Sequence, residues 1–185
     1  SAFGVRGIQM RVDGIPQTLP DGQTQLDSID PSLIERMDIL RGPSASLYGN
    51  ASGGMIDITT REAPKEAFVI MPRQVIGQYG YLKSELFMGG SNGNVGYSVF
   101  GSHLQQNGWR DHSAMQNMFS QAKLNFRTSA NSDLMLVFRE FYSPLSKDPG
   151  ALTSTEIQAD RRQASARNVQ FNAGEEIRQE EIGMR

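Results

Sequence analysis

Long stretches in the second part of this chain alternate apolar and polar side chains, which restricts the secondary structure they can form. In residues 115–127, MQNMFSQAKLNFR, the even positions from Met118 to Phe126 are mostly apolar, and the odd positions are polar except for Phe119. Alternation with a period of two indicates a β-strand with one apolar and one polar face. Similar alternation occurs in residues 81–88, 95–105 and 169–177, and less cleanly in 133–142.

The connections between these stretches alternate in length. Short turns at 91–94 (SNGN) and 128–132 (TSANS) alternate along the chain with long connections at 105–114 and 143–168. Short turns on one side and long loops on the other, joining antiparallel strands of about 10 residues, are typical of outer-membrane β-barrels. A soluble or surface β-rich binding or adhesion module also alternates, so it stays open as an alternative. It predicts a polar outer face, whereas a barrel predicts an apolar outer band.

Composition excludes several classes of protein. The net charge of −2 argues against a nucleic-acid-binding protein, which usually carries a basic face. The absence of Cys excludes disulfides and thiolate metal sites. No apolar run approaches the roughly 18–20 residues of a transmembrane helix. Barrel strands need no such run, because only their alternate positions are apolar.

The first 65 residues have a different sequence pattern, in which short apolar runs are separated by residues that favour turns. Asp30-Pro31 predicts an N-cap followed by proline at the first position of a short helix. Gly42-Pro43 predicts a second short helix over 44–48, ended by Gly49. Residues 55–61 predict a strand, and the charged stretch 61–67 (REAPKEA) predicts an exposed linker. In the second part, TSTEIQADRRQ predicts a short helix capped by Ser154 or Thr155.

No motif of enzyme chemistry is present. GNASGG (49–54) lacks the Lys-Ser or Lys-Thr of a phosphate-binding loop, and GVRGIQ (4–9) lacks the third glycine of a dinucleotide fingerprint. The only histidines, His103 and His112, lack the spacing of a zinc site. We therefore expect neither an enzyme nor a resident metal or cofactor.

The run SLIERMDILRGPSASLYGNASGGMIDITTR (32–61) resembles the signature of the plug domain of TonB-dependent outer-membrane receptors. FGVRGIQMRVDGIPQTLPDGQ (3–23) resembles the upstream plug segment of the same family. NGWRDHSAMQNMFSQAKLNFR (107–127) is similar to the family's early barrel strands. DPGALTSTEIQADRRQASARN (148–168), together with FGVRG (3–7) and PDGQ (20–23), looks closest to receptors for pyrroloquinoline quinone, neighbours of the ferric-citrate type.

The resemblance implies a mixed α+β plug over residues 1–63 and the start of a transmembrane β-barrel over 64–185. Family barrels have 22 strands, which enclose a plugged lumen. About six strands are expected here, so we expect a fragment of a longer receptor. The implied function is import of a scarce ligand, a ferric siderophore or pyrroloquinoline quinone, energised by the inner-membrane TonB complex. The implied location is the bacterial outer membrane, with lipid around a monomeric barrel.

The resemblance also assigns roles to individual residues. Arg6 and Arg41 correspond to plug arginines that pair with glutamates of the barrel wall. The packed turn of the plug would comprise Gly42, Pro43, Leu47, Tyr48, Gly49, Gly53 and Gly54. The expected outward tips of the plug and the long loops supply candidate ligand-facing residues, namely Gln9, Asp21, Gln23, Trp109, Arg110 and His112. A receptor of the same fold that signals, or that docks a phage or colicin, is a further alternative.

Overall fold

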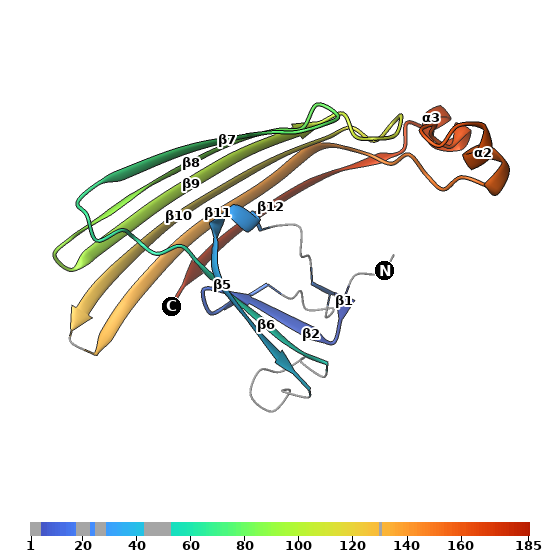
Figure 1. Ribbon diagram of the computed structural model, residues 1–185. Helices are drawn as coiled ribbons and strands as arrows, with labels where there is room; N and C mark the ends of the chain where they lie inside the picture. The colour runs from blue at the N-terminus through green and yellow to red at the C-terminus, as the bar shows by residue number, and fades with distance from the viewer. Residues whose placement is uncertain (1–4, 18–22, 25–28, 43–52, 130) are drawn as a thin grey trace.

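The computed structural model describes residues 5–17, 23–24, 29–42, 53–129 and 131–185 (Figure 1). The predicted helix at 44–48 lies outside these ranges. Within them, the strands form a large antiparallel sheet and two small sheets. None of the described helices has the length and apolarity to cross a membrane.

Six long strands follow one another in sequence order across the large sheet, which we call the wall. They are β7 (Val69–Ile76), β8 (Leu82–Asn92), β9 (Val95–Gln106), β10 (Met115–Ser129), β11 (Ser132–Lys147) and β12 (Gly174–Met184). Each strand pairs antiparallel with the next. The wall curves over the N-terminal part of the chain (Figure 1).

The outer face of the wall carries a continuous apolar band. One row of directly paired positions crosses all six strands and comprises Ile70, Met88, Val99, Ala122, Phe138 and Ile182. Val99 is 42% exposed and Phe138 is 39% exposed. The opposite face buries polar side chains, among them Glu85, Gln121, Lys123 and Arg139. The inner face buries these charges beside aromatic side chains such as Phe87 and Phe100, while the opposite face exposes an apolar band. The exposed apolar band disagrees with the polar outer face that the soluble alternative predicts.

The small sheets lie beneath the concave face of the wall (Figure 1). A four-stranded sheet has the order β3 (Ile15–Pro16), β2 (Ile8–Val12), β6 (Gly54–Thr60) and β5 (Ile34–Arg41). A two-stranded sheet pairs β1 (Val5–Arg6) with β4 (Gln23–Thr24). The core of the larger one contains Met10, Val12, Ile29 and Ile58. We call the described part of residues 5–60 the plug.

A single turn of 3-10 helix in the plug, η1 (Pro31–Leu33), packs against the wall. The Asp30 side chain accepts a hydrogen bond from Ser32 N at 2.9 Å, which confirms the predicted N-cap and proline start. Leu33 then packs into an aromatic cluster on the wall, formed by Phe87, Phe100, Phe119 and Phe141. The cap therefore orients the apolar residue that anchors the plug.

The linker after β6 lies directly on glycines of the wall. Ser91 N donates to Glu66 O at 2.8 Å, and Tyr97 Oη donates to Ala67 O at 2.9 Å. This close approach requires Gly90, because a Cβ there would lie 2.1 Å from Ala67 O. The predicted division between residues 63 and 64 falls within this linker and stays a prediction.

The structure corrects two sequence expectations in the long loop. Helix α2 (Ser154–Ala159) is capped by Thr153, not by Ser154 or Thr155, because Thr153 and Glu156 form a reciprocal capping box. The strand expected from residue 169 begins at Gly174. Residues before it form helix α3 (Ala166–Gln170) and a turn in which Asn172 has a φ of 50°.

Replacing Gly90 with alanine should displace the linker from the wall, at a cost of about 1–3 kcal/mol for the forced repacking. Gly101→Ala on β9 is the matched control, because its added Cβ would have no atom within 4 Å. The measurement is the rate of tryptic cleavage after Lys65 in the folded protein. We expect faster cleavage in Gly90→Ala alone. Equal rates in both variants would contradict the role of Gly90 in packing the linker against the wall.

Candidate functional site

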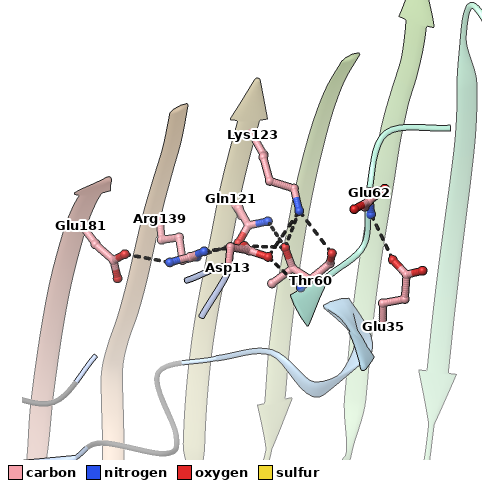
Figure 2. A network of polar contacts seen from close by, with 8 residues as sticks. All are labelled: Asp13, Glu35, Thr60, Glu62, Gln121, Lys123, Arg139 and Glu181. Carbon is pink, nitrogen blue, oxygen red and sulfur yellow. Dashed lines mark hydrogen bonds and ion pairs between the residues drawn. The ribbon is translucent and has the colours of Figure 1, made fainter. Parts of the chain in front are cut away.

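A network of buried charges joins the plug to the inner face of the wall (Figure 2). Its plug side is built by Asp13, which lies in the turn between β2 and β3 with a φ of 54°, and by Thr60 at the end of β6. Thr60 N donates to Asp13 Oδ1 at 2.9 Å, and Thr60 Oγ1 donates to Asp13 Oδ2 at 2.8 Å. These bonds hold the carboxylate at the edge of the plug that faces the wall.

The wall side is built by three neighbouring strands. Lys123 Nζ on β10 lies 3.5 Å from Asp13 Oδ1 and donates to Thr60 Oγ1 at 2.9 Å. Arg139 Nη2 on β11 pairs with Asp13 Oδ2 at 2.6 Å, and its Nη1 pairs with Glu181 Oε1 on β12 at 2.7 Å. Asp13, Lys123 and Arg139 are all buried, so each charge depends on the others for compensation.

A glutamine completes the network. Gln121 Oε1 accepts from Arg139 Nε at 2.7 Å, and Gln121 Nε2 donates to Thr60 Oγ1 at 3.1 Å. Arg139 thus donates hydrogen bonds from Nε and both terminal nitrogens, to Asp13 of the plug and to Gln121 and Glu181 of the wall. Such a fixed fork of donors specifies the position of the plug relative to three strands.

A second polar cluster surrounds η1. Lys83 Nζ on β8 lies 2.7 Å from both Asp30 Oδ1 and Glu85 Oε1. Ser32 Oγ donates to Glu85, and Ser102 Oγ donates to Asp30. The η1 turn is therefore held by charge as well as by the packing of Leu33.

The two plug carboxylates are tuned by these contacts. Burial opposes the ionisation of Asp13, but the charges of Lys123 and Arg139 and the hydrogen bonds from Thr60 outweigh it and lower the pKa of Asp13. Burial likewise opposes the ionisation of Asp30, and the contacts with Lys83, Ser102 and Ser32 N lower the pKa of Asp30. Both groups therefore stay ionised to a lower pH than a free aspartate.

Of the two arginines expected to pair with the barrel, only Arg41 has a side chain that the structure describes. The side chain of Arg6 lies outside the described residues, although its backbone pairs with Gln23. Arg41 ends β5, is exposed, and forms no ion pair with the parts of the chain that the structure describes. Its predicted partners belong to later strands, so this role stays a prediction.

The predicted turn of the plug is only partly described. Gly54 has a φ of 138°, and a Cβ there would lie 2.4 Å from Leu40 O. Gly53 N donates to Gly7 O at 2.7 Å, and Gly42 has a φ of 99°. Gly53 and Gly54 thus allow the backbone to approach Gly7 and β5 closely, whereas Gly42 supplies a positive φ in open space. The remaining members, Pro43, Leu47, Tyr48 and Gly49, lie outside the described residues.

The candidate ligand-facing residues are dispersed. Gln9 lies half-buried on β2, and its Oε1 is buried with no hydrogen-bond partner among the residues that the structure describes. Asp21 and the side chain of Gln23 lie outside the described residues. Trp109, Arg110 and His112 lie together in the loop between β9 and β10. Their contact with a ligand stays a prediction.

Sequence reasoning missed the members of the buried network. Asp13 appeared only as part of a motif, and Lys123 only as one of the polar positions of an alternating strand. A charge at an inward position of a strand whose other face is apolar was the available signal. Within the described ranges, no group of three or more His, Asp or Glu side chains could hold a metal ion.

Comparison with known proteins identifies the plug. Residues 1–55 match the family model of the TonB-dependent receptor plug domain. The chain is 38% identical over 100 residues to a hemin receptor of Yersinia enterocolitica, covering 54% of this chain and 14% of that protein. It is 27% identical over 145 residues to the ferric aerobactin receptor of Klebsiella pneumoniae, covering 72% of this chain and 19% of that protein.

A solved structure shares the fold. The unliganded ferric citrate transporter FecA matches with a TM-score of 0.69 and 23% identity, over 86% of this chain and 25% of that one. The matched part of this chain spans less than a fifth of the length of the hemin receptor and of the ferric aerobactin receptor. Together these similarities support a TonB-dependent receptor and indicate the bacterial outer membrane as its location. The relatives are named as receptors, consistent with a chain that is not an enzyme.

Replacing Arg139 with methionine should destabilise the seating of the plug by about 3–5 kcal/mol, because Asp13 and Glu181 lose a buried partner. Arg178→Met on β12 is the control, since Arg178 is 63% exposed in its pairs with Glu140 and Glu180. An exposed pair contributes about 0–1 kcal/mol. Unfolding in denaturant measures both, and an equal effect of the two substitutions would refute the role of the network.

The lowered pKa values of Asp13 and Asp30 predict loss of stability in acid. Because both pKa values lie below the unfolded value of about 3.9, the contribution is complete above that pH and disappears as the pH falls through the folded values. Unfolding midpoints at pH 5, 4 and 3 measure it. Asp13→Asn should flatten the decline, whereas the exposed Asp38→Asn should leave it unchanged; a decline of the same slope in all three proteins would speak against this origin.

Proposed function

We propose that this chain is part of an energy-coupled importer, a receptor that binds a scarce ligand at the cell surface and carries it across the outer membrane. The observation that supports this most directly is the wall itself, which exposes an apolar band on its outer face and buries charged side chains on its inner face, where the plug is held. In an importer, the apolar face would contact lipid and the plug would close the lumen.

The described wall has two outer strands, β7 and β12, each with one neighbour in the sheet. Unpaired strand edges are an aggregation hazard and are incompatible with the interior of a bilayer. We infer that further strands continue the wall into a closed barrel of the kind that encloses a plug. Arg6 and Arg41 would then meet glutamates on those strands, which would hold the plug by releasable bidentate pairs.

The names of the relatives and the sequence of the second long loop support a proposal for the ligand. The relatives carry the names of hemin and siderophore receptors, so an iron-bearing siderophore or hemin is the primary proposal. Pyrroloquinoline quinone is the finer alternative suggested by residues 148–168. The ligand must prefer one state of the plug to shift it, and the TonB complex would supply the energy for release.

The function is tested by uptake in cells that depend on the receptor carrying this chain. Cells are given radiolabelled iron as ferric citrate or ferric aerobactin, labelled hemin, or labelled pyrroloquinoline quinone, with and without an uncoupler of the proton-motive force. We expect uptake of one ligand to fall to background with the uncoupler while surface binding persists.

Two other results would redirect the assignment. Uptake that is insensitive to the uncoupler would exclude energy coupling through TonB. Surface binding without uptake of any probe would favour the signalling or docking receptor of the same fold. Deletion of tonB in the same cells is the genetic control, and it should reproduce the effect of the uncoupler.

A further inference from the structure

Two loops at one end of the wall are bound into one unit by Arg110. These loops, residues 107–114 and 148–173, are predicted to face outward. Arg110 Nη1 donates to Gly150 O at 2.7 Å, and Nη2 donates to Gln163 O at 2.9 Å and Pro149 O at 3.2 Å. Arg110 Nε also donates to Gln163 O, at 3.1 Å. These bonds occupy the guanidinium with backbone carbonyls.

Further bonds fix the same unit. Asp111 N donates to Arg162 O at 2.7 Å, and Arg162 Nε donates to Trp109 O at 3.2 Å. His112 Nε2 contacts Ala173 O at 2.9 Å. Because both loops are ordered by their own contacts, a ligand that binds them would not bear the full entropic cost of ordering them.

The unit forms an open apolar pocket of about 240 Å³ on its surface, lined by Trp109, Arg110, Leu152, Ile157 and Arg161. A cavity of about 150 Å³ holds a benzene ring, and sites for whole drug-sized ligands begin near 300 Å³. The pocket therefore suits one or two aromatic rings at the edge of a larger ligand. Trp109 and Ile157 are 42% and 45% exposed, so their apolar surface is available to it.

The charge at this pocket comes from Arg161. Arg110 is occupied by carbonyls, whereas Arg161 is exposed and has no hydrogen bond or ion pair with any residue in the described ranges. A guanidinium at the rim of an apolar pocket complements a carboxylate attached to an aromatic ring. A non-aromatic anion would gain the charge contact but not the apolar one.

We propose that this pocket binds the edge of a planar aromatic ligand that carries a carboxylate, with its ring against Trp109 and Ile157 and its carboxylate on Arg161. The inference deepens the proposed function and rests on it for the nature of the ligand. It separates hemin and pyrroloquinoline quinone, which are planar aromatic carboxylates, from ferric citrate, which has no aromatic ring. Arg110 holds the loops that form the site.

The test is equilibrium binding of hemin, pyrroloquinoline quinone and ferric citrate to the purified receptor that carries this chain. Trp109→Ala and Arg161→Gln should each weaken binding of at least one of the two aromatic probes about tenfold. Trp109→Phe should retain most of the affinity, because it keeps an aromatic ring. Arg167→Gln is the matched control, an exposed arginine of the same loop that does not line the pocket.

The outcomes are separable from those of the uptake experiment. Binding of an aromatic probe that all four variants leave unchanged overturns the pocket, as does a receptor that binds ferric citrate alone. Aromatic binding that depends on Trp109 and Arg161, in a receptor without energy-dependent uptake, supports the pocket while the importer function fails.

Discussion

The fold depends on placing charge inside a curved sheet, where each buried charge must meet a partner. Lys123 and Arg139 point inward from β10 and β11, and Asp13 of the plug compensates both. A buried ion pair adds little net stability over an apolar contact, but losing one partner is costly. The wall and the plug are therefore mutually dependent, because neither can leave its charges unpaired in the other's absence.

This dependence explains why the inner face of the wall is rich in polar side chains. The inner face must accommodate Asp13, Asp30 and the η1 turn, so it carries hydroxyls, a glutamine and charges beside a small aromatic cluster. The outer face has no protein partner among the described residues and is apolar along paired rows such as Met88–Val99–Ala122. One face thus specifies the plug, and the other suits a bilayer.

Local signals in the sequence predicted the local structure well. The period-two pattern located the wall strands from β8 to β12 but not β7, and Asp30-Pro31 predicted the capped turn, because each of these signals depends on residues close together in the chain. The start of β12 was wrong, since Val169 and Phe171 fit the alternation but lie in α3 and the turn after it, where their N–H groups donate to Ser165 O and Arg167 O. The buried network could not be derived, because Asp13 and Arg139 are 126 residues apart and meet only in three dimensions.

The distance between the loops and the network constrains how a ligand could act. Lys123 lies roughly 27 Å along β10 from Met115, where the loop ends, at about 3.4 Å per residue. A ligand held by the loops therefore cannot touch Asp13, and it can shift the plug only through a difference in its affinity for two arrangements. The contacts available to change are the ion pairs, because a set of discrete polar partners can be exchanged for another set, whereas the packed aromatic contact of Leu33 resists gradual deformation. The ion pairs around Asp13, rather than the apolar packing of Leu33, are thus the part of the interface suited to releasing the plug.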